Sequence, residues 1–412
     1  MSAAVLSIGT ELTRGELTDT NAAWLSEQLT ALGCDVGEKA TVPDDVEAIR
    51  EALVRLSARH RVLVATGGLG PTTDDLTAEA AARAAGVPLV RHEPSLEAIK
   101  RRFAAAGREM SASNAKQADL PEGALAIENP VGTAPGFALT LGGCRCFFLP
   151  GVPHEMKRLF ADSVQPAIGP TVERRTHQVR LRTFGLPESV VGERLAGIEE
   201  AHEGVTLGYR ATFPEIEVKV LARAASAAEA EEIALRVAHE VRERLGEAVY
   251  GEGEDTYPAY VGRVLRDRGL TLALAESCTG GMVGSLITDV PGSSDYLLLD
   301  AVTYSNAAKT SVLGVSSEIL RAYGAVSAEC ATAMAEGARR IADADIAVSI
   351  TGIAGPGGGS ESKPVGTVWI GLARRDRPTE AALHQLSGDR WRIRRWAAYL
   401  ALRTIVRSAQ QG

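Results

Sequence analysis

The sequence predicts an α/β protein made of an N-terminal α/β domain, a small α+β middle domain and a C-terminal α/β domain. Strand-like apolar runs alternate with helical periodicity over residues 1–170 and again over 259–412. Residues 172–250 change to a strand-helix-strand-strand-helix pattern. The segment GEGEDTYP, residues 251–258, has the glycine, acid and proline content of a linker.

Composition narrows the class of protein. The chain has 412 residues, of which 45% are hydrophobic and 23% charged, as in ordinary globular proteins. Its net charge of −8 argues against non-specific binding to nucleic acid or to anionic membranes. The N-terminus lacks a signal-peptide pattern, and no apolar run approaches the roughly 18 residues of a membrane span. Five scattered cysteines without a CxxC pair make a disulfide framework or a zinc site improbable, so we expect a reduced, cytoplasmic protein.

The N-terminal domain follows a strand-helix-strand order. Residues 5–8 and 62–65 are short apolar runs typical of buried strands. Residues 20–32 and 44–57 have apolar side chains at helical spacing, and a further helix is expected from about Thr77. This order implies a parallel sheet whose ligand site lies at the carboxyl ends of its strands.

The first candidate site is the glycine-rich turn TGGLGPTTDDLT, residues 66–77. Its glycines are Gly67, Gly68 and Gly70. They let backbone amides approach an anion, and the start of the following helix adds a favourable dipole. Carboxylates beside a phosphate, here Asp74 and Asp75, usually act through a divalent cation. The alternative is a tight turn in which Asp74 caps the next helix.

Three further turns are expected at the same edge of the sheet: residues 9–21, 129–136 and 149–156. Their polar groups would be Glu11, Asn21, Asn129 and Glu155. Several such loops at one edge favour a binding site over isolated tight turns.

The second candidate site is LALAESCTGGMVGSLIT, residues 272–288, which runs from a strand through a turn into a helix. Ser277 and Cys278 both lie at the turn, and either is a candidate nucleophile, because adjacent residues usually point apart and only one should face a ligand. Thr279, Gly280 and Gly281 would supply free amides at the helix start, an arrangement that forms oxyanion holes.

A serine nucleophile in this domain needs a base other than histidine, since no histidine lies between His239 and His384. Lysine is the recognised substitute when it is uncharged, and Lys309 follows in YSNAAK. The Tyr304 hydroxyl would bridge the serine and the lysine and relay the proton. The alternatives are a core aromatic at Tyr304 and a solvated helix charge at Lys309.

Two other segments suit a phosphate or ribose. The glycine-rich loop within residues 349–371 offers many free amides. On the last helix, Arg390 and Arg394 share a face, where one of them could reach a phosphate; a solvated helix face is the alternative.

Across its whole length the chain resembles the CinA family of competence/damage-inducible proteins. The motifs IGTEL, DTNA, TGGLGPTTDD, NPVGTAPG and LPGVPHEM are similar to those of the MoaB/MogA-like molybdopterin-binding fold, which implies a three-layer α/β domain over residues 1–170. The motifs AESCTGG, GSSDY, YSNAAK and TGIAGP resemble the nicotinamide mononucleotide deamidases, residues 259–412. Residues 172–250 resemble the KH-like domain of full-length members, but no GxxG of an RNA-binding unit occurs between residues 180 and 210.

For the C-terminal domain the resemblance implies hydrolysis of nicotinamide mononucleotide to nicotinate mononucleotide and ammonia, with no cofactor. Ser277 would be the nucleophile, with Lys309 and Tyr304 as base and relay. The residues implied near substrate are Cys278, Thr279, Gly280, Gly281, Ser294, Thr351, Gly352, Gly355 and Arg390, with Arg392 as the alternative to Arg390.

For the N-terminal domain the resemblance implies an ADP-ribose pyrophosphatase that needs Mg²⁺, Co²⁺ or Mn²⁺. The metal ligands would be Asp74, Asp75 and Glu11. The nucleotide and phosphate site would comprise Glu11, Asn21, Thr66, Gly67, Gly68, Gly70, Thr72, Asp74, Asn129, Pro150 and Gly151. The two activities together would recycle pyridine nucleotides.

The resemblance also implies a homodimer, and neither a membrane nor nucleic acid is expected as a partner. The alternative function is a non-enzymatic adaptor in competence or the DNA-damage response, with a vestigial pterin- or nucleotide-binding N-terminal domain.

Overall fold

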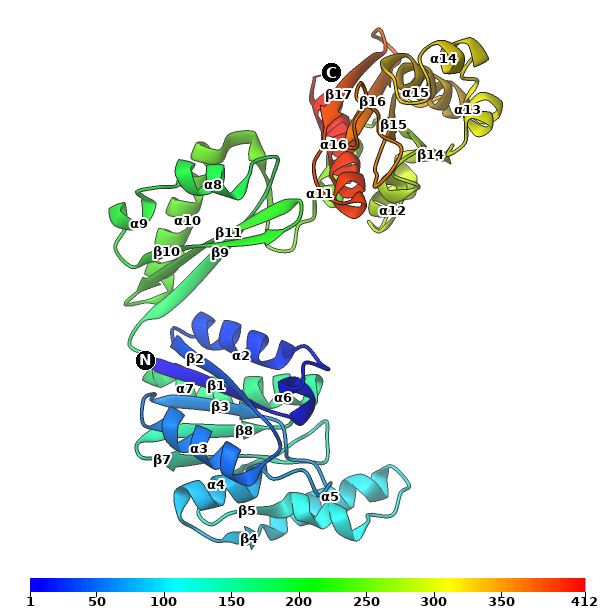
Figure 1. Cartoon of the computed structure of the whole chain (residues 1–412). Helices are drawn as coiled ribbons and strands as arrows, with labels where there is room; N and C mark the ends of the chain where they lie inside the picture. Colours follow the sequence, from blue (N-terminus) through cyan, green and yellow to red (C-terminus); the bar gives the residue numbers. More distant parts are fainter. Residues whose placement is uncertain (412) are drawn as a thin grey trace. The chain divides into compact units, whose positions relative to one another are not determined.

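The structure is a computed structural model that describes residues 1–411 (Figure 1). The chain divides into two compact units. One comprises Met1–Gln178 with the stretches His202–Val205 and Leu221–Arg236, and the other holds the remaining residues. Each domain is therefore described by itself.

The N-terminal domain is built on a six-stranded sheet in the order β2-β1-β3-β8-β7-β6. The strands are β1 (Ser2–Ile8), β2 (Asp35–Val42), β3 (Val62–Thr66), β6 (Leu125–Ile127), β7 (Gly136–Leu141) and β8 (Cys144–Leu149). β2, β1, β3 and β8 pair in parallel, but β7 pairs antiparallel with both of its neighbours, β8 and β6, so the prediction of a parallel sheet was wrong for this side. Only Gly142 and Gly143 separate β7 from β8, and a two-residue turn joins strands that run in opposite directions.

Helices cover both faces of this sheet and give the predicted three layers. Leu25 and Leu29 of α2 (Thr20–Ala31) and Met156 of α6 (Pro153–Leu159) pack on one face. Ile49 of α3 (Val46–Ser57) and Ala80 of α4 (Thr77–Ala85) pack on the other. The remaining elements are α1 (Thr10–Thr13), β4 (Leu89–Arg91), α5 (Glu93–Ala105), η1 (Ala112–Ala118), β5 (Asp119–Pro121), η2 (Phe160–Val164), α7 (Gln165–Ile168) and η3 (Gly169–Thr171).

The middle domain has the predicted order of strands and helices, plus one strand. Its elements are β9 (Arg175–Phe184), α8 (Glu188–Arg194), α9 (Ile198–Ala201), β10 (Val205–Thr212), β11 (Glu215–Ala224), α10 (Ala227–Leu245), η4 (Gly246–Ala248) and β12 (Val249–Glu252). The sheet order is β10-β11-β9-β12. Gly251 and Glu252 pair with β9, and Tyr257 begins the next helix, so the segment predicted as linker is regular structure at both ends.

The C-terminal domain has a five-stranded sheet in the order β14-β13-β15-β16-β17. Its strands are β13 (Leu272–Glu276), β14 (Leu297–Val302), β15 (Ile346–Gly352), β16 (Thr367–Arg374) and β17 (Glu380–Gln385). Its helices are α11 (Tyr257–Asp267), α12 (Met282–Thr288), η5 (Ser293–Asp295), α13 (Asn306–Leu313), α14 (Ser317–Ala322), α15 (Ala328–Ala342) and α16 (Arg390–Gln410). β14, β13 and β15 pair in parallel, whereas β16 pairs antiparallel with both of its neighbours, β15 and β17. All five residues of β13 are buried, so its carboxyl end is a fixed point in the domain.

An aromatic cluster joins the middle domain to α16. The ring of Phe184, at the end of β9, lies 4.8 Å from that of Tyr257, 5.3 Å from Tyr399 and 5.7 Å from Trp396 (centroid distances). The Arg395 guanidinium also donates to the Phe213 carbonyl oxygen at 3.0 Å. Such rings contribute both buried area and favourable ring geometry.

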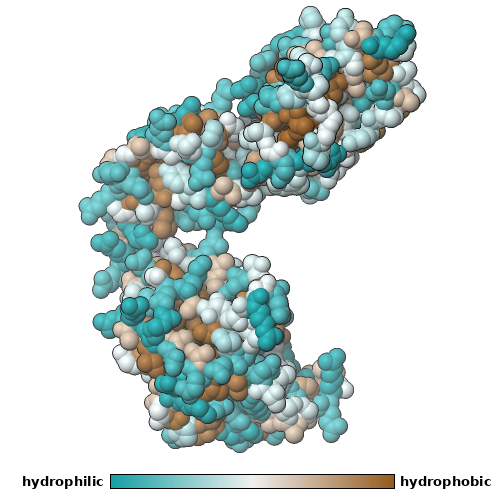
Figure 2. All heavy atoms as spheres, viewed as in Figure 1, coloured by the Kyte–Doolittle hydropathy of each residue, from teal (hydrophilic) through white to brown (hydrophobic). Residues whose placement is uncertain are grey.

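Most of the visible surface is hydrophilic or intermediate in hydropathy, with several separate apolar patches (Figure 2). Within residues 1–411, no helix is both long and apolar enough to cross a bilayer. The five cysteines are free and buried.

Candidate functional site

The turn between β13 and α12, residues 277–281, continues from the buried centre of the sheet. The Ser277 amide donates to the Ile350 carbonyl oxygen at 3.0 Å, so the serine is still anchored to neighbouring β15. Gly280 and Gly281 adopt φ of +63° and +86°, a backbone region that favours glycine. The backbone around Ser277 is therefore held in place on both sides. The residue is 8% exposed.

Lys309 of α13 is brought to the Ser277 side chain. Its Nζ donates hydrogen bonds to Ser277 Oγ at 2.9 Å and to the Thr303 carbonyl oxygen at 2.7 Å. The lysine is 1% exposed, and no carboxylate in the described chain forms an ion pair with it. Burial lowers the pKa of Lys309, because the ammonium form loses its hydration.

Cys278 faces the core instead. It packs among the residues between the sheet and helices α11, α12 and α16. Burial and then the nearby Glu276 charge raise the pKa of Cys278 to about 12, so the thiol stays protonated at neutral pH. Of the two candidate nucleophiles, Ser277 is the one that is hydrogen-bonded to a lysine.

Tyr304 does not bridge Ser277 and Lys309, which are bonded directly. It is 62% exposed, and its hydroxyl accepts a hydrogen bond from Arg390 at 3.1 Å. Arg390 also donates to the Gly355 carbonyl oxygen at 2.8 Å. Side chains alternate along an extended segment, so burying Thr303 turns Tyr304 outward. The predicted relay position was therefore wrong for this structure.

The amides of Gly280 and Gly281, predicted to be free, are both engaged. The Gly281 amide donates to Glu276 Oε2 at 2.9 Å, and the Gly284 amide donates to Glu276 Oε1 at 2.8 Å. The Gly280 amide donates to the Ser277 carbonyl oxygen at 3.0 Å. The sequence analysis did not identify Glu276 as part of this turn. The signal that could have found it is a carboxylate at the end of an otherwise apolar strand.

Arg394 holds the opposite side of the turn. Its guanidinium donates to the carbonyl oxygens of Cys278 at 3.1 Å and Thr279 at 2.6 Å, so of the two arginines considered for a phosphate, Arg394 stabilises the turn instead. The buried hydroxyls of Thr279 and Thr303 have no hydrogen-bond partner among residues 1–411. Thr279 is 0% exposed and Thr303 is 1% exposed.

The other residues implied near substrate differ in their placement. The Thr351 hydroxyl donates to the Ala325 carbonyl oxygen at 2.7 Å, and a Cβ at Gly352 would overlap the Thr367 carbonyl oxygen. Ser294 lies exposed in η5. The Arg392 guanidinium lies over the Phe213 ring at 5.1 Å, so Arg390, not its alternative, contacts the glycine-rich loop.

In the N-terminal domain, three of the four predicted turns line one cavity of about 320 Å³. The lining residues from these turns include Gly68, Gly70, Asp75, Thr133, Pro150, Gly151 and Glu155. The fourth turn is tied to this edge by Asn21, whose amide donates to the Gly151 carbonyl oxygen at 2.7 Å. Within its own turn, Asn129 accepts from the Gly132 amide at 2.8 Å and donates to the Ala134 carbonyl oxygen at 2.8 Å. Its amide also donates to Glu155 Oε2 at 2.7 Å and so links two of the predicted turns.

The glycine-rich turn itself is stabilised by its own side chains. The Thr66 hydroxyl donates to the Pro150 carbonyl oxygen at 2.9 Å. The Thr72 amide and hydroxyl donate to Asp75 Oδ2 at 2.8 and 2.6 Å. Thr72 also bonds Asp74, which lowers the pKa of that carboxyl group. Gly67 has φ +109°, and a Cβ there would overlap the Ile8 carbonyl oxygen, so only glycine fits.

The expected metal ligands Glu11, Asp74 and Asp75 are not gathered into one set. No group of three or more His, Cys, Asp or Glu side chains able to hold a metal occurs in the described chain. Asp75 is turned toward Thr72, and the exposed Glu11 carboxylate folds over Gly9. This arrangement suits a metal only if phosphate oxygens and waters complete the coordination, as is common for Mg²⁺.

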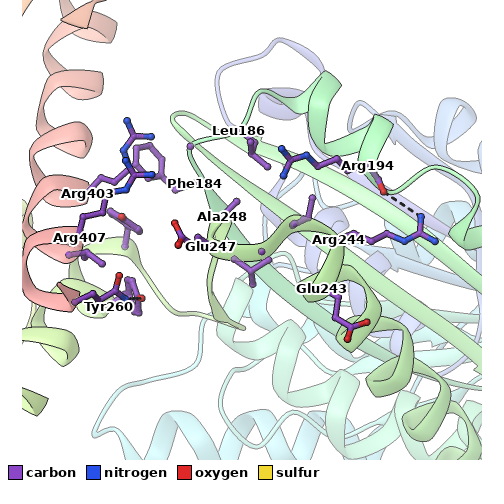
Figure 3. Close-up of a pocket in the computed structure, with 17 residues that line it drawn as sticks. Phe184, Leu186, Arg194, Glu243, Arg244, Glu247, Ala248, Tyr260, Arg403 and Arg407 are labelled. Atoms are coloured by element: carbon purple, nitrogen blue, oxygen red, sulfur yellow. Dashed lines mark hydrogen bonds between the residues drawn. The ribbon is translucent and has the colours of Figure 1, made fainter. Parts of the chain in front are cut away.

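A larger cavity of about 590 Å³ lies beside α16 and the middle domain (Figure 3). Arg403 and Arg407 line it from α16, and Leu186, Glu247 and Ala248 from the middle domain. None of the residues predicted for either site lines it.

Three protein-family models match consecutive parts of the chain. Residues 4–170 match a model described as a probable molybdopterin binding domain. Residues 178–251 match the damage-inducible protein CinA KH domain, and residues 254–409 the CinA C-terminal domain. The three matches confirm the predicted types of domain in their predicted order.

Full-length relatives are also similar. A CinA-like protein of Geobacter sulfurreducens is 47% identical over 407 residues, 98% of this chain and 98% of its own length. One from Desulfosudis oleivorans is 45% identical over 410 residues, 99% of each chain. Among solved structures, a CinA protein of Thermoplasma acidophilum is 35% identical and aligns with 42% of this chain and 97% of its own, with a TM-score of 0.38.

Proposed function

The chain belongs to the CinA family, and from that premise we propose that its C-terminal domain hydrolyses nicotinamide mononucleotide to nicotinate mononucleotide and ammonia. The observation that carries the proposal is the buried contact of 2.9 Å between Lys309 Nζ and Ser277 Oγ. A buried lysine without a carboxylate partner can be uncharged near neutral pH and act as a base. The proposal is thus a serine amidohydrolase with a lysine base.

In the first half-reaction, Ser277 Oγ bonds to the carboxamide carbon while its proton passes to uncharged Lys309. The resulting ammonium gives that proton to the departing nitrogen, the carbon–nitrogen bond breaks, and ammonia leaves. Water then attacks the ester, again with Lys309 as base, and releases the carboxylate and the serine. Thr303, whose carbonyl oxygen is 2.7 Å from Nζ, orients the amine in both steps.

The surroundings of Ser277 suit a polar, anionic substrate. The unpartnered hydroxyls of Thr279 and Thr303 are donors for a carboxamide or its oxyanion. The glycine-rich loop after β15 and the guanidinium of Arg390 suit a phosphate. Tyr304, bonded to Arg390, is assigned to substrate positioning rather than to proton relay.

The test is ammonia release by the purified full-length chain from nicotinamide mononucleotide, compared with free nicotinamide and with the nucleoside lacking phosphate. We expect turnover of the nucleotide and a far higher KM for the compounds without phosphate. Absence of ammonia release from all three would reject the deamidase. A salt-dependent micromolar affinity for DNA would then favour the adaptor alternative.

As a second function, we propose that the N-terminal domain splits the pyrophosphate of ADP-ribose with a divalent metal. The supporting observation is the 320 Å³ cavity, where Gly68, Gly70 and Asp75 meet residues of two other loops. Backbone amides there would bind phosphate, and the nearby carboxylates would hold a metal together with the phosphate oxygens.

This activity is tested by AMP release from ADP-ribose with Mg²⁺, Co²⁺ or Mn²⁺. Asp75→Asn should abolish turnover, and Asp162→Asn, at an exposed residue outside the cavity, should not. ADP-ribose binding without turnover under any metal would leave a nucleotide-binding module in place of the enzyme.

A further inference from the structure

The β13–α12 turn depends on one buried carboxylate. Glu276 is fully buried, and each of its two oxygens accepts one backbone amide, from Gly281 at 2.9 Å and from Gly284 at 2.8 Å. Glu276 directly precedes Ser277, so the same residue ends the strand and ties back the start of α12. Any displacement of this carboxylate must therefore move the turn that presents Ser277.

A second carboxyl group, Asp300 of β14, lies beside it. Asp300 Oδ1 is buried and has no hydrogen-bond partner in the described part of the chain. The other oxygen packs against Gly284 so closely that a Cβ there would overlap it. The Asp300 carboxyl is within hydrogen-bonding reach of Glu276, and β14 pairs directly with β13.

No cation neutralises this pair among residues 1–411. The basic side chains that contact the turn, Lys309 of α13 and Arg394 of α16, are bonded elsewhere. Lys309 donates to Ser277 and to a carbonyl oxygen, and Arg394 donates to two carbonyl oxygens. The other titratable group on the turn is the Cys278 thiol, which stays protonated.

Glu276 is fully buried and Asp300 is partly buried. Two such neighbouring carboxylates without a cation cannot both be ionised at low cost. The two amides fix Glu276 as an acceptor, so the proton belongs on Asp300. Burial, followed by the charge of Glu276 and a hydrogen bond to it, raises the pKa of Asp300 to about 7.

We propose that Glu276 and Asp300 are a proton-sharing pair of positioning residues, in which neutral Asp300 donates its O–H to Glu276 and so keeps Glu276 on the amides that orient Ser277. Loss of that proton places two negative charges side by side and loosens the turn. The effect on catalysis rests on the proposed deamidase, whereas the effect on stability does not depend on it.

The test compares the wild-type chain with Asp300→Asn, whose amide still donates to Glu276 but cannot ionise. The matched control is Asp289→Asn, which removes an exposed carboxylate at the end of α12. The kcat for ammonia release and the melting temperature are measured from pH 5.5 to 9. Glu276→Gln, which leaves one amide without its acceptor, should lower kcat at every pH.

Above pH 7 the wild-type rate should fall by up to about tenfold per pH unit, following the protonated fraction of Asp300. The acid pKa is raised in the folded state, so its stabilising contribution is complete below about pH 4 and is lost as pH rises through 7. Asp300→Asn should lack both declines, and Asp289→Asn should retain them.

If the melting temperatures of wild type and Asp300→Asn changed with pH in the same way, the proposal that Glu276 and Asp300 share a proton would be wrong. Loss of the stability decline alone, with the rate decline unchanged, would overturn the positioning role. If no variant releases ammonia, the deamidase fails, and the melting curves still decide whether the pair shares a proton.

Discussion

Lys309 Nζ lies 2.9 Å from Ser277 Oγ although 32 positions separate the two residues. Parallel pairing of β13 with β14 places Glu276 opposite Val302, so the chain leaves both strands at the same edge of the sheet. The residues that follow, Ser277 and Thr303, thereby meet, and the first turn of α13 returns Lys309 to them. The contact is a product of topology and not of local sequence.

Ser277→Ala should reduce ammonia release by at least about a thousandfold, because the reaction loses the atom that bonds to substrate. The matched variant is Cys278→Ala. Its thiol is buried, with a pKa near 12, so most of the activity should remain. The measurement is kcat for both variants, with circular dichroism to show that each is folded. A Ser277→Ala enzyme with wild-type kcat would contradict the assignment.

Lys309→Met should change how stability depends on pH. Burial lowers the pKa of Lys309 in the folded chain, whereas the unfolded chain titrates near the usual value of about 10.4. The stabilising contribution of uncharged Lys309 is therefore complete above about pH 10.4 and is lost as pH falls toward the folded pKa. Methionine does not titrate, so the Lys309→Met variant has no such loss. The melting temperature of the variant, relative to that of wild type, should therefore rise as pH is lowered from 10 to 7.

The control is Lys100→Met, at an exposed lysine of α5. Its melting temperature should differ from that of wild type by a constant amount over the same range. If Lys309→Met shows the same constancy, Lys309 is not forced toward its uncharged form, and another base must be sought.

Tyr304→Phe separates positioning from proton relay. The variant loses the hydroxyl that accepts from Arg390 at 3.1 Å. A positioning role predicts a several-fold higher KM for nicotinamide mononucleotide with kcat nearly unchanged. A fall in kcat of about a hundredfold at unchanged KM would instead show a group that acts in proton transfer. Steady-state kinetics at saturating and limiting substrate distinguish the two.

Gly284→Ala should destabilise the chain by about 1–3 kcal/mol, the usual cost of overpacking. The added methyl would overlap Asp300 Oδ2. Gly192→Ala in α8 is the matched helical variant, because no atom lies within 4 Å of its added Cβ. That change should be neutral or stabilise by about 0.5–1 kcal/mol. Equal denaturant midpoints for the two variants would refute the packing argument.

Much of the fold follows from local signals in the sequence. The buried strands were predicted from apolar runs, and α2 and α3 from helical spacing, because periodicity is a local property. The antiparallel β7 was missed although the Gly142–Gly143 pair between β7 and β8 indicated a hairpin. The error came from extending one parallel pattern over the whole sheet.

The candidate site also has features that the sequence predicted and features that it did not. Motif positions brought attention to Ser277 and Lys309, but the direction of Tyr304 depends on which of two adjacent side chains the core accepts. The contact between Glu276 and Gly284 depends on how α12 returns over its own strand. The expected three-carboxylate metal set failed because Asp75 satisfies the turn that precedes it. Each of these outcomes is decided by packing between segments rather than by spacing.

The aromatic contacts of Phe184 with Tyr257, Trp396 and Tyr399 also bear on protein engineering. A recombinant fragment that starts at residue 254 would lack Phe184 and leave those three rings facing water. Such a fragment would tend to self-associate at high concentration. Two designs avoid this exposed apolar surface on α16, the helix that also carries Arg394. One replaces Trp396 by a polar residue, and the other retains the middle domain.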